Sequence, residues 1–124
     1  MEGQVLDPYV LAGELSSSPV VPLNNFNPRL AASLIVKPGA GVLYGFTVTN
    51  TNASSQFVQV FDAAAVPGDG AVPILAISVQ GGNGTGFNWI PGRAFLVGIV
   101  LCNSSTQATK TIGSADCIFD AQYL

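Results

Sequence analysis

The sequence predicts one all-β domain: an antiparallel β-sandwich or jelly roll that carries an extended N-terminal arm. The length of 124 residues suits a single domain. The 14 glycines and 8 prolines divide the chain into short segments rich in β-branched and aromatic residues, which are typical of strands. No segment shows a sustained helical period, and a helical turn begun at Asp62 would end at Pro67.

Segments that are apolar or alternating, and bounded by turn residues, are predicted to be strands. They are Leu30–Lys37, Val42–Asn50, Gln56–Asp62, Val72–Gln80, Gly84–Ile90, Arg93–Cys102 and Asp116–Tyr123. Pro91-Gly92 is the turn predicted between two of them. Residues two apart on a strand share a face, so Gln56–Asp62 and Arg93–Cys102 are largely apolar on both faces. Such strands are covered above and below, which favours two packed sheets.

The first 28 residues predict an arm outside the sheets, because their four prolines remove ladder donors and favour extended backbone. We therefore divide the chain into an arm, residues 1–28, and a β-sandwich domain, residues 29–124. The predicted partner-binding residues are the apolar side chains of the arm: Val5, Leu6, Tyr9, Val10, Leu11, Val20, Val21, Leu23 and Phe26. They need a surface to lie on, either their own domain or a neighbouring subunit, and the low charge of the chain favours the neighbour.

Composition limits the classes of partner. Hydrophobic residues make up 48% of the chain and charged residues 9%, against roughly 25% charged in an ordinary domain. The longest apolar run, Ala94–Cys102, is about half of the roughly 20 residues that a membrane-spanning helix needs, so no membrane partner is expected. A net charge of −3 removes the attraction that dominates nucleic-acid binding, so no nucleic acid is expected either.

The N-terminus and the cysteines both indicate in which cellular compartment the protein is made. Met1–Asp7 is acidic where a secretory signal needs basic residues and an apolar stretch, so we expect synthesis in the cytosol. The two cysteines, Cys102 and Cys117, do not form a disulfide framework. Buried free thiols are the favoured interpretation in a reducing compartment, and a bridge across a hairpin is the alternative.

The residues that enzymes use are scarce. The chain has no histidine, the commonest general base and a common metal ligand. Its acids after the arm are Asp62, Asp69, Asp116 and Asp120, and turn-forming or solvated roles suit them better than a catalytic pair. Gly81–Gly86 has the glycines but not the lysine of a phosphate-binding loop, which favours a hairpin turn. We expect no enzyme, no cofactor and no metal site.

The single tryptophan leaves an alternative function open. Phe87 and Trp89 lie two residues apart on a predicted strand, so they share a face. If exposed, the pair could stack on a sugar, which would suit a glycan-binding or adhesion module on a virion surface. Two such residues more often both face the core, and the core is the favoured interpretation.

A resemblance to a known family covers about residues 36–124. It is carried by Gly92–Thr106, Ala108–Gly113 and Ala115–Tyr123, together with Tyr44-Gly45-Phe46, Asn50-Thr51 and Gln56–Asp62. In these segments the chain resembles the capsid decoration (cement) proteins of tailed phages. The match lies in the general residue pattern of several segments and includes no active-site motif. The arm carries no part of it.

The resemblance implies a virion structural protein on the capsid surface. Members of that family are typically β-rich homotrimers that brace neighbouring subunits of the major capsid protein. We accordingly expect a homotrimer that binds the major capsid protein and stabilises the shell. The physical argument adds that Val5–Phe26 would grip the capsid subunits.

Overall fold

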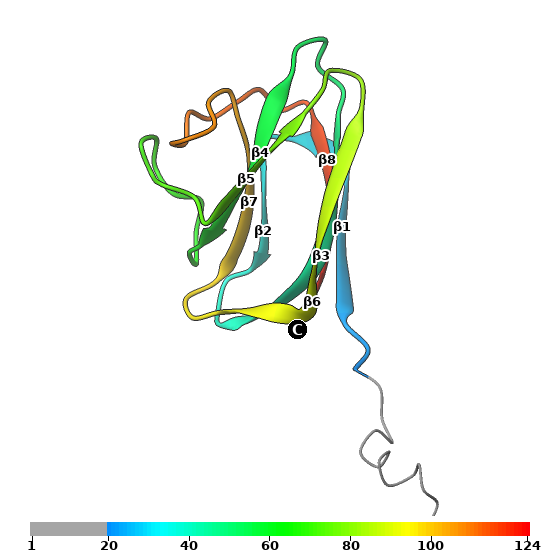
Figure 1. The fold of residues 1–124 in the computed structure, drawn as a ribbon, viewed down its shortest axis with the longest axis vertical. Coiled ribbons are helices and arrows are strands. Elements are labelled where there is room, and N and C mark those ends of the chain that lie inside the picture. The colour runs from blue at the N-terminus through cyan, green and yellow to red at the C-terminus, as the bar shows by residue number, and fades with distance from the viewer. Residues whose placement is uncertain (1–19) are drawn as a thin grey trace, which may run out of the picture.

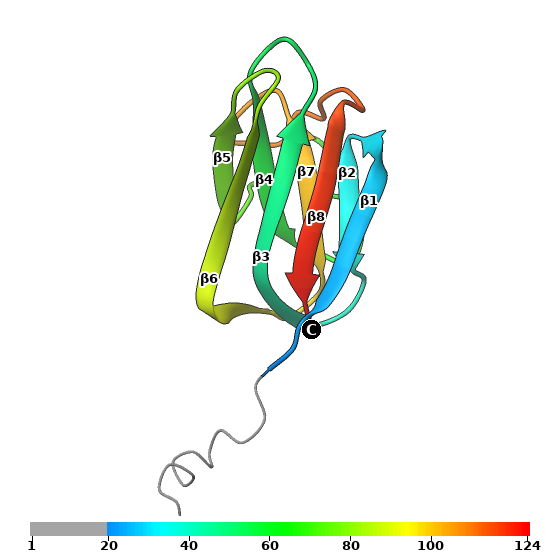
Figure 2. The ribbon, with the colours of Figure 1, turned by 90° about the vertical axis from the view of Figure 1, so that its right-hand side faces the viewer.

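The computed structural model describes residues 20–124, which form eight strands in two antiparallel sheets packed face to face (Figures 1 and 2). The strands are β1 (Leu23–Ala31), β2 (Ser33–Lys37), β3 (Gly41–Asn50), β4 (Gln56–Asp62), β5 (Leu75–Val79), β6 (Gly84–Phe95), β7 (Ile99–Ser104) and β8 (Cys117–Tyr123). The predicted all-β sandwich is confirmed. The predicted partner-binding residues Val5, Leu6, Tyr9, Val10 and Leu11 lie outside the described residues.

The strand order is that of a jelly roll. One sheet runs β1-β8-β3-β6 and the other β2-β7-β4-β5, so the first strand pairs with the last, the second with the seventh, and so on inward. Every connection except the one between β4 and β5 crosses from one sheet to the other. The turns and loops therefore gather at the two ends of the sandwich, as Figure 2 shows.

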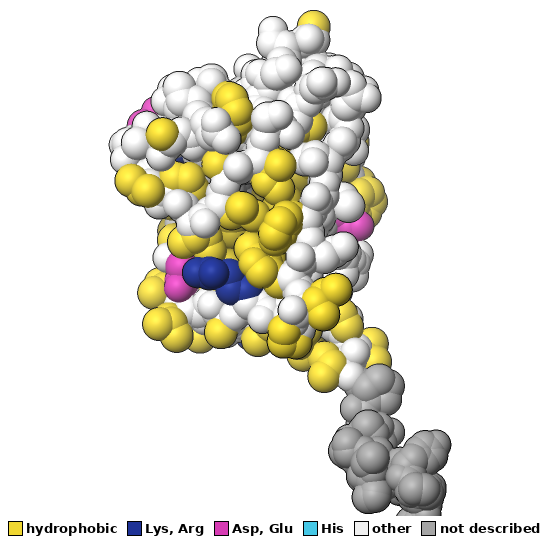
Figure 3. Space-filling view, viewed as in Figure 1, with side chains coloured by type: hydrophobic (Ala, Val, Ile, Leu, Met, Phe, Trp, Pro, Cys, Tyr) yellow, Lys and Arg dark blue, Asp and Glu magenta, His cyan; other side chains and the backbone are white. Residues whose placement is uncertain are grey.

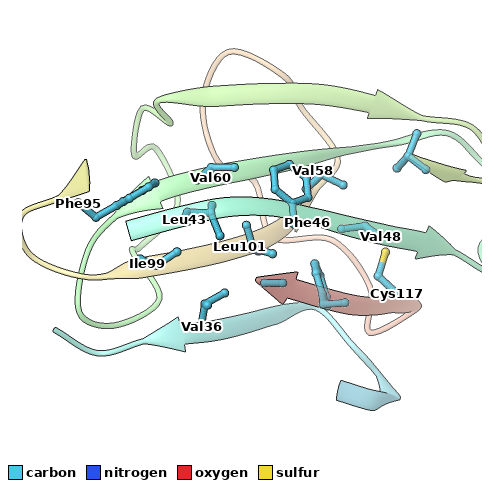
Figure 4. Close-up of a cluster of buried hydrophobic side chains, with 13 residues drawn as sticks. Val36, Leu43, Phe46, Val48, Val58, Val60, Phe95, Ile99, Leu101 and Cys117 are labelled. Atoms are coloured by element: carbon cyan, nitrogen blue, oxygen red, sulfur yellow. The ribbon is translucent and has the colours of Figure 1, made fainter. Parts of the chain in front are cut away.

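The core lies between the inner faces of the two sheets. Alternate residues of the strands point inward, and the largest fully buried side chains include Phe46, Phe95 and Phe119. Figure 4 shows how side chains from β3, β4 and β7 meet there. Burying one such side chain stabilises the fold by about 1.5–3 kcal/mol, so this layer holds the two sheets together.

Part of the outer face of the second sheet is covered by a loop layer, which we define as residues 63–74 and 105–113. Phe61, Val100 and Cys102 face outward from β4 and β7, yet all are buried, and Ala63 and Ala71 pack on them. Gln59 is buried there too, and its Nε2 donates to the carbonyl oxygens of residues 106, 107 and 109 at 2.9–3.1 Å. The loop layer explains why β7 is buried on both faces.

Strand β1 corrects the predicted extent of the arm. It begins at Leu23, so Leu23 and Phe26 belong to the first sheet instead of an arm that ends at residue 28. The prolines misled the prediction because β1 is an edge strand, where a missing donor is tolerated. Pro28 lies where the pairing with β8 is irregular, between Asn27 and Ala31.

The predicted strand Arg93–Cys102 is in fact two strands. Residues 93–95 end β6, residues 96–98 turn, and β7 begins at Ile99. The predicted turn at Pro91-Gly92 is wrong as well, since β6 continues through it. Gly92 has a φ of 132°, and a Cβ there would lie 3.0 Å from the Tyr44 ring, so β6 bends where only glycine fits.

The hairpin predictions are also wrong. The turn at Gly81–Asn83 joins β5 to β6, which lie in different sheets, so it crosses the sandwich. Cys102 lies in β7 and Cys117 in β8, again in different sheets, and both thiols are free. Burial raises the pKa of each thiol to about 11, which keeps both protonated and unreactive at neutral pH. The interpretation of the cysteines as buried free thiols is confirmed.

Candidate interaction surface

The two ends of the sandwich differ in chemistry. We call polar end the one formed by residues 51–55, 80–83 and 105–116, where most side chains are Asn, Gln, Ser, Thr or Asp. We call apolar end the opposite one, where β1 begins and β8 ends and where residues 38–40 and 96–98 turn. The apolar end is at the bottom in Figures 1 and 2.

The polar end is bonded to itself through a buried asparagine. The Asn50 amide donates to the carbonyl oxygen of Ser54 at 2.9 Å and, at 3.4 Å, to those of Val79 and Gln80. Its Oδ1 accepts the backbone N–H of Asn52 at 3.0 Å. One side chain thus ties the β3–β4 loop to the end of β5.

Two more asparagines tie the last loop to this end. Asn52 Nδ2 donates to the Asp116 carboxylate at 2.7 Å, and Asn103 Nδ2 donates to the carbonyl oxygen of Ser114 at 2.9 Å. Asn103 is fully buried. These bonds hold the loops of the polar end to one another, whereas the buried Oδ1 of Asn103 has no hydrogen-bond partner among residues 20–124.

The apolar end exposes large apolar side chains instead. Ile90, Leu96 and Val97 are 93%, 81% and 53% exposed. Others at this end are Val20, Val21, Leu23 and Leu124. Figure 3 shows apolar side chains along this lower edge of the molecule, with basic side chains close above it. Contiguous apolar groups of this kind mark sites of protein association.

Backbone pairing joins these residues, which are far apart in the sequence. Leu23 pairs with Tyr123, which pairs with Leu43, which pairs in turn with Arg93. Leu124 continues the row, since its N–H donates to the Val42 carbonyl at 2.9 Å and its carbonyl accepts the Val42 N–H at 2.8 Å. The apolar end is therefore built on the rigid ladder of the first sheet.

The turn at this end is shaped by Asp62. Its carboxylate accepts the backbone N–H groups of Leu96 at 3.1 Å, Val97 at 2.8 Å and Gly98 at 3.2 Å. The bond from Leu96, with those from the next two amides and the charge of Arg93, lowers the pKa of Asp62. The backbone of the turn is thus satisfied while its side chains project outward.

Two of the four cations lie at the same end. Lys37 is the last residue of β2, and Arg93 pairs with Leu43 near the start of β3. The Asp62 carboxylate lies at this end as well, where it binds the turn and where the charge of Arg93 acts on it. The exposed apolar side chains, rather than a net charge, are therefore what this end offers to a partner.

The described part of the predicted partner-binding set lies at or near the apolar end. Val20, Val21 and Leu23 are exposed there, whereas Phe26 is exposed further along β1 and pairs with Asp120. Sequence reasoning missed Ile90, Leu96, Val97 and Leu124. Because Ile90, Leu96 and Val97 are apolar, we predicted that they lie in core strands. Nothing in the sequence distinguishes the exposed Leu96 from the buried Ile99.

The acids are placed apart, in structural roles. Asp69 forms an ion pair with the buried Lys110 at 2.9 Å, which lowers the Asp69 pKa and fastens the two loops of the loop layer. Asp116 precedes β8 and binds Asn52, while Asp120 lies within β8. Among residues 20–124 no group of three or more His, Cys, Asp or Glu side chains could hold a metal ion. That part of the chain also contains no helix long and apolar enough to span a membrane.

Trp89 packs against the core at the open edge between β5 and β6. Its ring centroid lies 6.3 Å from that of Phe46 and 6.4 Å from that of Phe95, and Phe87 meets it edge-on at 4.9 Å. These contacts confirm the core interpretation of Trp89. The Phe87 ring is 37% exposed, and the glycan-binding alternative stays a prediction.

Comparisons of this chain with protein-family models, with curated proteins and with solved structures give no match.

Proposed function

We propose that this protein is a virion structural protein, a capsid decoration protein that binds the major capsid protein as a homotrimer and stabilises the shell. The observation that supports the proposal most is the apolar end. Seven large apolar side chains are exposed around it, and the described chain offers them no cover. Exposed apolar side chains gathered in one place are typical of a surface that another protein covers.

Two further features support a role in binding rather than catalysis. The chain has no histidine, and its described aspartates are engaged with backbone or side-chain partners or lie singly. The jelly roll itself does not decide function, because one fold serves many. The capsid as partner rests on the resemblance of residues 36–124 to decoration proteins of tailed phages.

The arm is the second part of the proposed contact. It continues from Val20, at the apolar end, and it carries Val5, Leu6, Tyr9, Val10 and Leu11. An apolar segment joined to a domain that also carries an apolar surface gives a capsid subunit two sites to bind, which raises affinity through effective concentration.

Truncation tests the role of the arm. Because β1 begins at Leu23, a deletion of residues 1–19 removes most of the arm and leaves the sheet whole. We expect the truncated protein to keep its circular dichroism spectrum and its melting temperature, and to lose co-sedimentation with undecorated particles. Undiminished binding would remove the arm from the proposal.

Light scattering tests the homotrimer. The expected mass is three times that of the 12.7 kDa chain. A monomer at micromolar concentration that also fails to bind particles would overturn the proposed function as a whole.

A further inference from the structure

We propose that Asn83 and Gly84, at the turn between β5 and β6, form a site of self-modification. The backbone nitrogen of Gly84 attacks the side-chain carbonyl carbon of Asn83, and the resulting ring opens to aspartate or isoaspartate. The site goes beyond the proposed capsid role and is independent of it. Three features point to it: the pairing of β6, the exposure of both residues, and the contrast with a second site that the fold locks.

The Gly84 nitrogen faces the open side of an edge strand. Bonded and non-bonded residue pairs alternate along an antiparallel ladder. The Asn50 N–H donates to the Asn83 carbonyl oxygen at 2.8 Å, so the next pair, Thr49 with Gly84, is a non-bonded one. The N–H of Gly84 therefore points away from β3. Because β6 is the last strand of its sheet, no strand of residues 20–124 lies beside that N–H.

The Asn83 side chain is weakly held, at the upper end of the molecule in Figure 2. Both Asn83 and Gly84 are exposed. The Asn83 amide donates to the carbonyl oxygen of Gly81 at 3.3 Å, a long bond that water readily replaces. Gly84 has no Cβ to obstruct the approach of its nitrogen. The side chain of Asn83 is therefore free to rotate toward the nitrogen of the next residue.

A second site of the same kind is locked by the fold. Asp69 also precedes a glycine, Gly70, but the N–H of Gly70 donates to the Lys110 carbonyl oxygen at 2.8 Å. The Asp69 carboxylate is held as well, since it accepts Lys110 Nζ at 2.9 Å and the N–H of Ile112 at 3.1 Å. Neither the nitrogen nor the carboxyl carbon is available there. The hydrogen bonds of the fold thus restrict the reaction to Asn83.

The reaction needs only these two residues and water. The Gly84 nitrogen loses its proton to hydroxide and forms a bond with Asn83 Cγ. The bond from Cγ to Nδ2 breaks, and the side-chain nitrogen leaves as ammonia, which gives a cyclic imide, a succinimide. Addition of water to one carbonyl carbon of the ring gives aspartate, and addition to the other gives isoaspartate. Either product carries a carboxylate in place of the neutral amide.

The isoaspartyl product changes the polar end. Its backbone runs through the side-chain carbon atoms, which lengthens the chain by one carbon where β6 begins. At this point the Asn83 carbonyl oxygen accepts the Asn50 N–H, and the Asn83 N–H donates to the Gln80 carbonyl oxygen at 3.2 Å. Isoaspartate therefore loosens the bond between the β5–β6 turn and β3.

Ageing of the purified full-length protein tests the site. The protein is kept folded in warm, mildly alkaline buffer, which favours loss of the Gly84 proton, and modification is located by peptide mapping with mass spectrometry. We expect the peptide that contains Asn83 to gain mass as its amide becomes a carboxylate. Asn88, which is exposed and precedes the bulky Trp89, is the internal control and should change several-fold more slowly. Equal rates at the two asparagines would overturn the proposal, as would a folded protein that keeps Asn83 intact while the urea-denatured chain loses it.

Gly84→Ala is the matched variant. The added Cβ hinders the approach of the nitrogen, and it would lie 3.3 Å from the Val48 carbonyl oxygen, a close contact that a small shift of the edge strand relieves. We expect modification to slow several-fold while the circular dichroism spectrum stays unchanged, and an unaltered rate would overturn the role of Gly84. If this variant does not fold, Asn83→Gln serves instead, because a glutamine must close a larger ring. Loss of its amide at the wild-type rate would likewise overturn the proposal.

Asn83→Asp separates the new charge from the longer backbone. The aspartate variant carries the same added carboxylate as the aged protein, but its backbone is not lengthened. We expect the isoaspartyl fraction of the aged protein, isolated by chromatography, to melt at a lower temperature than Asn83→Asp. Equal melting temperatures would overturn the loosening of the polar end.

Discussion

The polar and apolar ends of the sandwich differ in what their side chains contact. At the polar end, the amide groups of buried Asn50 and Asn103 donate to backbone carbonyls of neighbouring loops, which holds those loops together. At the apolar end, one carboxylate, Asp62, satisfies the turn, and the side chains of Leu96 and Val97 are left outside. The polar end is therefore held together by its own side chains, whereas the apolar end leaves its side chains exposed.

The largest effect is expected at the polar end. Asn50→Ala removes the donor to three carbonyl oxygens and the acceptor of the Asn52 N–H, and leaves some of them buried without partners. We expect the free energy of unfolding to fall by about 3 kcal/mol, measured by urea denaturation. The neighbouring exposed Thr49→Ala is the control, with a change within about 0.5 kcal/mol. Equal effects would mean that Asn50 does not organise this end.

A smaller loss is expected from Asp62→Ala at the apolar end. The variant loses the acceptor of three backbone N–H groups, but these lie near the surface, where water can replace the carboxylate. We expect a loss of about 1–2 kcal/mol, as for removal of a helix N-cap. Asp120→Ala is the control, because the side-chain donor to that carboxylate is a Gln122 amide at 3.4 Å. A loss as large as that of Asn50→Ala would erase the contrast between the ends.

The pH dependence of stability distinguishes the same residue further. The pKa of Asp62 is lowered in the folded chain, so its bonds stabilise the fold above the pKa of the unfolded chain, about 4, and this stabilisation is lost as the pH falls through the lower folded pKa. Asp69 contributes in the same sense, because Lys110 lowers its pKa. We expect Asp62→Asn to flatten the fall in melting temperature between about pH 5 and pH 2. A curve parallel to that of the wild type would contradict this role.

The smallest effect on stability is expected from the exposed apolar side chains. Ile90→Ser with Leu96→Ser should change the free energy of unfolding by no more than about 0.5 kcal/mol, since neither side chain packs in the core. The same variant should bind particles more weakly in co-sedimentation. A stable variant with unaltered particle binding would show that this end is not a docking surface.

The sequence predicted strands best where a strand is covered on both faces. The predicted bounds of β4, Gln56–Asp62, are those observed, because turn residues flank this apolar run on both sides. The Arg93–Cys102 run was misread because its break depends on the Asp62 carboxylate, more than thirty residues away. Strand β1 was missed because its proline and its asparagines suit an edge strand as well as an arm.

The apolar end could not be predicted from local patterns. Leu23, the pair Ile90 and Leu96, and Leu124 come from three places in the chain, and only the pairing of β1, β8, β3 and β6 brings them to one end. Chemical character was predictable and position was not. The absence of histidine and the scarcity of charge were visible at once, but which apolar residues lie outside depends on the fold.

The loop layer makes the two broad faces of the molecule unequal. Residues 63–74 and 105–113, fastened by Lys110 and Asp69, lie over β4 and β7, whereas Thr47 and Thr49 stand bare on the outer face of β3. Two copies could therefore pack back to back through the bare face of the first sheet, whereas the loops keep a second copy away from β4 and β7. Stacking of one broad face on another would end at such a pair.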